Sequence, residues 1–135
     1  MAKSVNTTMP LIKIKINLHD NKHTPVYFYE REIWFVHLGH NIGFEQNGKG
    51  NKFLRPVLII KKYNKDLCTV VALTSSKKNG KYYMYIEGKE HASSTVILSQ
   101  IKTISSRRLV YKKGMVSKDL FIEIKKRIKL ILNIA

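Results

Sequence analysis

The chain has 135 residues, which suits a single domain, and 44% of them are hydrophobic, which is enough to bury a core. Its one cysteine, Cys68, excludes a disulfide within the chain, and no apolar run approaches the ~18 residues that a membrane-spanning helix needs. Because nothing in the chain can span a membrane, we expect a cytoplasmic protein. Lys and Arg number 25 against 9 Asp and Glu, and the net charge of +16 favours a polyanionic partner, with nucleic acid as the first candidate, an acidic protein as the second and an anionic membrane surface as the third.

The N-terminal part of the chain predicts two strands and a long loop. Apolar residues alternate with polar ones over Leu11–Leu18, which is the period of a strand, and Lys13 and Lys15 leave no continuous apolar core for a signal peptide. Aromatic and β-branched residues over Glu32–Leu38 predict a second strand. The polar, glycine-bearing segment Gly39–Asn51 is predicted to be a long loop, and long loops in compact domains are often functional.

Further strands and one helix complete the expected fold. The strands are predicted over Val57–Ile60, Cys68–Leu73, Lys81–Glu87, Thr95–Leu98 and Lys102–Ile104, with Ser99 and Gln100 separating the last two. At the C-terminus, Ser117 is a candidate N-cap, and apolar residues follow at helical spacing, with basic residues on the opposite face. The pattern predicts a mainly β fold, a small β-barrel with a C-terminal amphipathic helix.

The sequence carries no motif for a metal or a nucleotide cofactor, and we expect neither. The five histidines are scattered, and the glycines of the 39–51 segment match neither a Walker loop nor a dinucleotide fingerprint. What remains is a set of polar residues at loop or strand-end positions. Arg55 could offer two donors to a phosphate or could pair with Glu45 or Glu32. Thr74 and Ser75 could face a ligand or could cap their own turn.

Five segments, in order, resemble the MazF/PemK family of toxins from toxin–antitoxin pairs. They are E-I-W-F-V-x-L-G, N-I-G-x-E-Q-N-G-K, F-x-R-P-V-L-I, A-L-T-S and S-T-V-I-L-S-Q-I-K-T-I-x-x-R-R-L. On this resemblance, residues 31–135 form the toxin domain and residues 1–30 an N-terminal extension. It implies an SH3-like small barrel of the MazF/PemK/CcdB type and a homodimer that an acidic antitoxin inhibits.

The resemblance also implies an activity, a metal-independent endoribonuclease that cuts single-stranded RNA. Arg55 and Thr74, with Ser75 beside Thr74, then match the family motifs and suit the stabilisation of the transition state. Glu45 matches the Glu of G-x-E-Q and is the only carboxylate near the motif that could act as the base. Some relatives carry an Arg-x-Asp pair where this chain has Ile97 and Ser99. Two readings therefore stand, a nuclease that uses Glu45 and a catalytically weak or inactive member that binds nucleic acid or blocks a target, as gyrase poisons of similar architecture do.

Basic and aromatic residues offer candidate contacts to RNA. The polar candidates are Lys49, Lys52, Lys77, Lys78, Gln100, Arg107 and Arg108. Tyr82, Tyr83 and Tyr85 could stack on bases, but alternation predicts that at least one of them lies in the core. Trp34 and Cys68 are predicted to be core residues. A solvated basic face, or a general lysine bias of the organism, is the alternative explanation of the charge.

Overall fold

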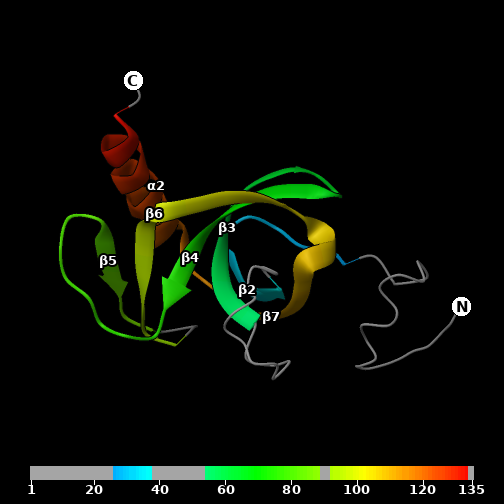
Figure 1. The fold of residues 1–135 in the computed structure, drawn as a ribbon, viewed down its shortest axis with the longest axis horizontal. Helices are drawn as coiled ribbons and strands as arrows, with labels where there is room; N and C mark the ends of the chain where they lie inside the picture. Colours follow the sequence, from blue (N-terminus) through cyan, green and yellow to red (C-terminus); the bar gives the residue numbers. More distant parts are fainter. Residues whose placement is uncertain (1–25, 38–53, 89–91, 134–135) are drawn as a thin grey trace, which may run out of the picture.

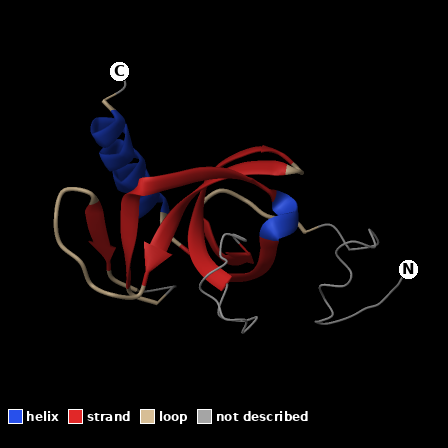
Figure 2. Ribbon diagram, in the orientation of Figure 1, coloured by secondary structure: helices blue, strands red, loops and turns tan. Residues whose placement is uncertain are grey.

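The computed structural model describes residues 26–37, 54–88 and 92–133 of the chain. In these residues, six antiparallel strands form one strongly curved sheet, and one α-helix packs on it (Figure 1; Figure 2). The strand order is β5-β6-β4-β3-β2-β7. The predicted mainly β class with a C-terminal helix is therefore confirmed. The strand predicted over Leu11–Leu18 and the loop predicted over Gly39–Asn51 lie outside the described residues.

The strands agree with the sequence pattern at four places. They are β2 (Glu32–His37), β3 (Leu54–Asn64), β4 (Leu67–Thr74), β5 (Tyr83–Ile86), β6 (Ser94–Ser105) and β7 (Leu109–Met115), followed by helix α2 (Lys118–Leu132). A short 3-10 helix, η3 (Ser106–Arg108), joins β6 to β7. Strands β2 to β5 overlap the predicted ones, whereas β7 was not predicted.

Strand β6 corrects the prediction of two short strands. Ala72 of β4 pairs with Ile97, but its neighbour Val71 pairs with Ile101, so the ladder skips Leu98–Gln100. The polar residues Ser99 and Gln100 therefore lie in a bulge inside one continuous strand, because a bulge admits extra residues without ending the pairing.

The sheet has a hydrophobic core on each face. One core contains Trp34, Val57, Cys68 and Leu109, and the other lies between the sheet and helix α2. Trp34 and Cys68 are buried as predicted, and burial raises the pKa of the Cys68 thiol to about 11. The predicted closure into a barrel is not seen in the described residues, because β5 and β7 are the two edges of the sheet and do not pair with each other.

Helix α2 forms where the sequence predicts it. The Ser117 hydroxyl accepts a hydrogen bond from the Leu120 N–H at 3.1 Å, which satisfies one of the free donors of the first turn. Phe121, Ile124 and Ile128 are buried against the sheet, and Figure 1 shows the helix beside β5 and β6. Among the described residues, no helix combines the length and the apolar character that crossing a membrane requires.

Candidate active site at one end of the sheet

Two of the predicted catalytic residues lie at the same end of the β3–β4 pair. Val57 of β3 pairs with Ala72 of β4. Arg55 precedes Val57 by two residues and Thr74 follows Ala72 by two residues. Since side chains alternate along a strand, Arg55 and Thr74 share the face of Val57 and Ala72. The fold thus brings together a guanidinium and a hydroxyl that are 19 residues apart in the sequence.

Arg55 is exposed, and Glu32 is not its partner. Among the described residues, the Arg55 side chain has no hydrogen bond or ion pair. Glu32 instead accepts hydrogen bonds from the Tyr29 N–H at 2.9 Å and the Trp34 Nε1–H at 3.0 Å, and it contacts Lys112. One of the two structural explanations for Arg55 therefore falls away. The other, Glu45, lies outside the described residues.

Thr74 caps the turn that follows β4, which is one of the two roles that the sequence allowed. Its Oγ1 accepts a hydrogen bond from the Ser76 N–H at 3.3 Å. A hydroxyl also has one proton to donate and a second lone pair, and Thr74 is only partly buried, so it keeps the capacity to bind a ligand. Ser75, beside it, is exposed.

Thr95 is a site residue that sequence reasoning missed. It lies opposite Thr74 on β6, is fully buried, and donates to the Ser76 carbonyl at 2.8 Å while accepting from the Lys78 N–H at 3.3 Å. These bonds fix the segment after β4 over the end of the sheet. In the sequence, Thr95 is only a threonine at the start of an apolar strand. Its place beside Thr74 cannot be inferred until the pairing of β4 with β6 is known.

The fixed segment places a cation over an aromatic ring. Lys77 Nζ lies 4.5 Å from the centroid of the Tyr85 ring, and Tyr85 pairs with Thr95. The expectation that one of the three tyrosines is a core residue was wrong, because Tyr82 and Tyr85 are exposed and Tyr83 is only partly buried. The reason is that β5 is an edge strand with a neighbour on one side alone.

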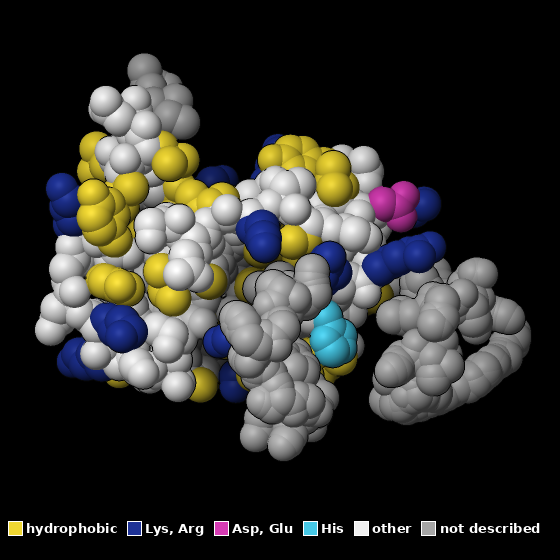
Figure 3. Space-filling model, viewed as in Figure 1, with side chains coloured by type: hydrophobic (Ala, Val, Ile, Leu, Met, Phe, Trp, Pro, Cys, Tyr) yellow, Lys and Arg dark blue, Asp and Glu magenta, His cyan; other side chains and the backbone are white. Residues whose placement is uncertain are grey.

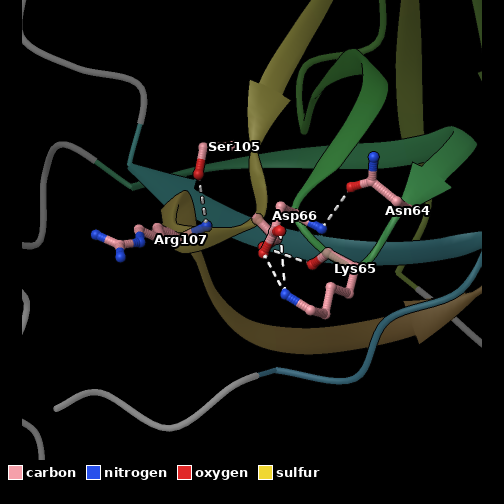
Figure 4. A network of polar contacts seen from close by, with 6 residues as sticks. Asn64, Lys65, Asp66, Ser105 and Arg107 are labelled. Carbon is pink, nitrogen blue, oxygen red and sulfur yellow. Dashed lines mark hydrogen bonds and ion pairs between the residues drawn. The ribbon is translucent and has the colours of Figure 1, made fainter. Parts of the chain in front are cut away.

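Arg107 and Arg108 are adjacent in sequence but lie in different surroundings. The Arg108 Nη1 donates to the His37 carbonyl at 3.0 Å, at the end of β2 and next to the residue that pairs with Arg55. The Arg107 side chain points away from the polar network at the tip of the β3–β4 hairpin, where Lys65 pairs with Asp66 (Figure 4). The contact with His37 therefore places Arg108 at the same end of the sheet as Arg55.

The other candidates are divided between surface positions and undescribed residues. Lys78 is exposed beside Thr95, and Gln100 is exposed in the β6 bulge. Glu45, Lys49 and Lys52 lie outside the described residues. The chain enters and leaves their segment through His37 and Leu54, which pair with each other.

The charge and donor set at this end of the sheet suit an anion. Figure 3 shows Lys and Arg spread over the visible face, with far fewer acidic atoms. No group of three or more His, Cys, Asp or Glu side chains in the described part of the chain could hold a metal ion. A guanidinium with hydroxyls beside it can bind and polarise a phosphate.

Comparisons with known proteins identify a family and a fold. A family model described as "PemK-like, MazF-like toxin of type II toxin-antitoxin system" matches residues 29–132. No curated protein matches the chain in sequence.

Solved structures share the fold at low identity. A MazE–MazF complex from Deinococcus radiodurans aligns with a TM-score of 0.66 and 19% identity, covering 82% of this chain and 100% of that one. A mycobacterial endoribonuclease in complex with its cognate antitoxin gives 0.63 and 13%, covering 81% and 98%. The Mycobacterium tuberculosis toxin MazF-mt6 gives 0.60 and 16%, covering 78% and 99%. At such identities, these likenesses establish the fold.

Proposed function

The chain belongs to the family of PemK-like, MazF-like toxins of type II toxin–antitoxin systems, and on this premise we propose that it is an endoribonuclease that cuts single-stranded RNA. The observation that carries the proposal is the position of Arg55 and Thr74 at one end of the β3–β4 pair. The likeness to a mycobacterial endoribonuclease supports it.

The proposed reaction uses a nucleophile that the RNA itself supplies. The 2′-hydroxyl loses its proton to a base and attacks the adjacent phosphorus, and the bond to the 5′-oxygen breaks as that oxygen takes up a proton. The products are a 2′,3′-cyclic phosphate and a 5′-hydroxyl. Negative charge gathers on the phosphoryl oxygens in the transition state, where the Arg55 guanidinium and the Thr74 hydroxyl stabilise it. Glu45 is the proposed base, and the reaction needs no metal ion.

The proposed partners follow from the family and the charge. Related solved structures contain a cognate antitoxin or MazE. We propose that an acidic antitoxin covers the basic end of the sheet and thereby excludes RNA, since a net charge of +16 attracts an acidic chain strongly. We also propose that the toxin acts in the cytoplasm as a homodimer.

A second function is favoured by one feature of β6. Ile97 and Ser99 stand where some relatives carry an arginine and an aspartate, and Ile97 pairs with Ala72 on the strand that leads to Thr74. Neither side chain can transfer a proton to or from RNA as a carboxylate can. The alternative is therefore a toxin that binds RNA, or blocks another target, without cutting.

The experiment that separates these functions is a cleavage assay in EDTA. Purified protein is incubated with a long single-stranded RNA, beside Arg55→Ala and the matched control Arg107→Ala, whose arginine lies on η3 and not on the strand ends that carry Arg55 and Thr74. We expect discrete cuts by the wild type and by Arg107→Ala, and a rate about 10²–10³-fold lower for Arg55→Ala because the transition state loses its cation. Primer extension maps the cuts, and a phosphatase-resistant 3′ end that acid opens identifies the cyclic phosphate.

Intact RNA at micromolar wild-type protein would contradict the nuclease. Tight binding of the same RNA that weakens with salt would then establish the alternative, a binding module on a nuclease fold.

A further inference from the structure

We propose that Lys77 and Tyr85 form a nucleotide subsite beside Arg55 and Thr74, in which the Tyr85 ring stacks on a base and the Lys77 ammonium binds a neighbouring phosphate. The inference rests on the proposed function, because it takes the ligand to be single-stranded RNA. It adds to that function a residue, Tyr85, that contacts a base next to the bound phosphate.

The pairing of three strands puts Tyr85 on the face of Thr74. Thr74 of β4 pairs with Thr95 of β6, and Thr95 pairs with Tyr85 of β5. Paired residues in antiparallel strands point to the same face, and neighbouring strands lie about 4.8 Å apart. Tyr85 is therefore roughly 10 Å from Thr74 along the sheet, so that neighbouring nucleotides of one RNA strand can reach both residues.

Lys77 is held in place by backbone contacts on both sides of it. The Thr95 hydroxyl binds the carbonyl of Ser76 and the N–H of Lys78, so the backbone of Lys77 is held next to the buried threonine. From there its Nζ reaches the Tyr85 ring at 4.5 Å. A cation held over an aromatic face restrains both side chains, which reduces the entropy lost when a nucleotide binds.

The turn before β5 fixes the other half of the subsite. Gly80 has a φ of +125°, a backbone conformation that residues other than glycine rarely adopt. Its carbonyl accepts a hydrogen bond from the Tyr83 N–H at 3.1 Å, so the turn leads directly into β5. Tyr85 remains 37% exposed on this edge strand, which leaves ring surface for a base.

Tyr82 provides a matched control within the same segment. It is 44% exposed, and Lys81 lies 5.3 Å from its ring centroid, so it too is an exposed tyrosine with a lysine over it. It precedes β5, however, and has no place in the row of paired residues that joins Thr74 to Tyr85.

The test measures binding of a strand that cannot be cut. A fluorescein-labelled, mixed-sequence 2′-O-methyl RNA lacks the attacking hydroxyl, and its affinity is read by anisotropy for the full-length wild type, Tyr85→Leu, Tyr85→Phe and Tyr82→Leu. We expect Tyr85→Leu to raise Kd about 5- to 100-fold, since stacking on an aromatic ring carries that much affinity. Tyr85→Phe, which keeps the ring, and Tyr82→Leu should bind like the wild type. Lys77→Gln should lower the slope of log Kd against log salt by about 0.7.

An abasic strand of the same length identifies the interaction. Wild type and Tyr85→Leu should bind it equally, because it offers no base to stack. Equal affinity of the two proteins for the base-bearing strand would overturn the subsite, and so would a difference that persists on the abasic strand. Neither result depends on cleavage, so failure of the subsite is distinguishable from failure of the nuclease.

Discussion

Glu32 is a buried carboxylate whose hydrogen bonds order the start of the sheet. It is only 4% exposed, and one of its oxygens accepts from both the Tyr29 N–H and the Trp34 indole. The other oxygen lies 3.3 Å from Lys112 Nζ, which joins β2 to β7. Leaving a buried polar group without a partner costs more free energy than a hydrogen bond contributes. The two hydrogen bonds to Glu32 should therefore contribute more to stability than its ion pair with the half-exposed Lys112.

Substitution of Glu32 should therefore separate these contributions. We expect Glu32→Ala to lower the free energy of unfolding by about 2–4 kcal/mol, because the buried Trp34 indole and the partly buried Tyr29 N–H lose their acceptor. Glu32→Gln keeps an acceptor oxygen and should cost less, and Lys112→Ala should cost under about 1 kcal/mol. Urea denaturation with a constant m-value measures all three. If Lys112→Ala proved as costly as Glu32→Ala, the ion pair and not the hydrogen bonds would hold this corner.

Helix α2 is an element whose start is set by a single side chain. The Ser117 hydroxyl binds the Leu120 N–H, and the helix then buries Phe121, Ile124 and Ile128 against the sheet. We expect Ser117→Ala to lower the free energy of unfolding by about 1 kcal/mol, with Ser117→Asp restoring it because a carboxylate also caps the N-terminus. Thermal and urea unfolding followed by circular dichroism test this. Equal stability of Ser117→Ala and wild type would contradict the cap.

Sequence patterns predicted the elements that carry a run of apolar, aromatic or β-branched residues, or an apolar repeat at helical spacing. Strands β2 to β5 and helix α2 meet that condition. Strand β7 does not, because it is an edge strand with bulges in its pairing to β2 and four exposed residues in a row, Val110–Lys113. In β6, local composition could not distinguish a bulge from a break, since the difference depends on whether β4 continues to pair beyond it.

The candidate site was predictable in its chemistry more than in its geometry. The types of Arg55 and Thr74 and their strand-end positions could be read from the sequence, but their shared face follows from the β3–β4 register. The contribution of Thr95 depends on a pairing across 21 residues. Arg31 shows the same limit, since its φ of +81° is set by backbone contacts with Ile59 and Val116 far along the chain.

At the scale of the whole molecule, a net charge of +16 attracts RNA to every face, so attraction alone does not define a site. The end of the sheet that carries Arg55 differs from the rest of the basic surface because the backbone that carries its lysines is held by hydrogen bonds to Thr95. Lys78 is exposed, and its backbone is held by Thr95. Lys65, at the tip of the β3–β4 hairpin, is also exposed but is paired with Asp66 at 3.1 Å. The two lysines therefore serve as a matched pair.

Salt titration of RNA binding tests whether the charge acts locally. Each phosphate neutralised by a cation adds about 0.7 to the slope of log Kd against log salt for a single strand. We expect Lys78→Gln to lower the slope by about that amount and Lys65→Gln to leave it unchanged, although both remove one charge. Anisotropy of a non-cleavable labelled RNA across a range of salt concentrations gives both slopes. An equal decrease of the slope in the two variants would mean that RNA binds over the whole basic surface, with no preference for the end of the sheet that carries Arg55.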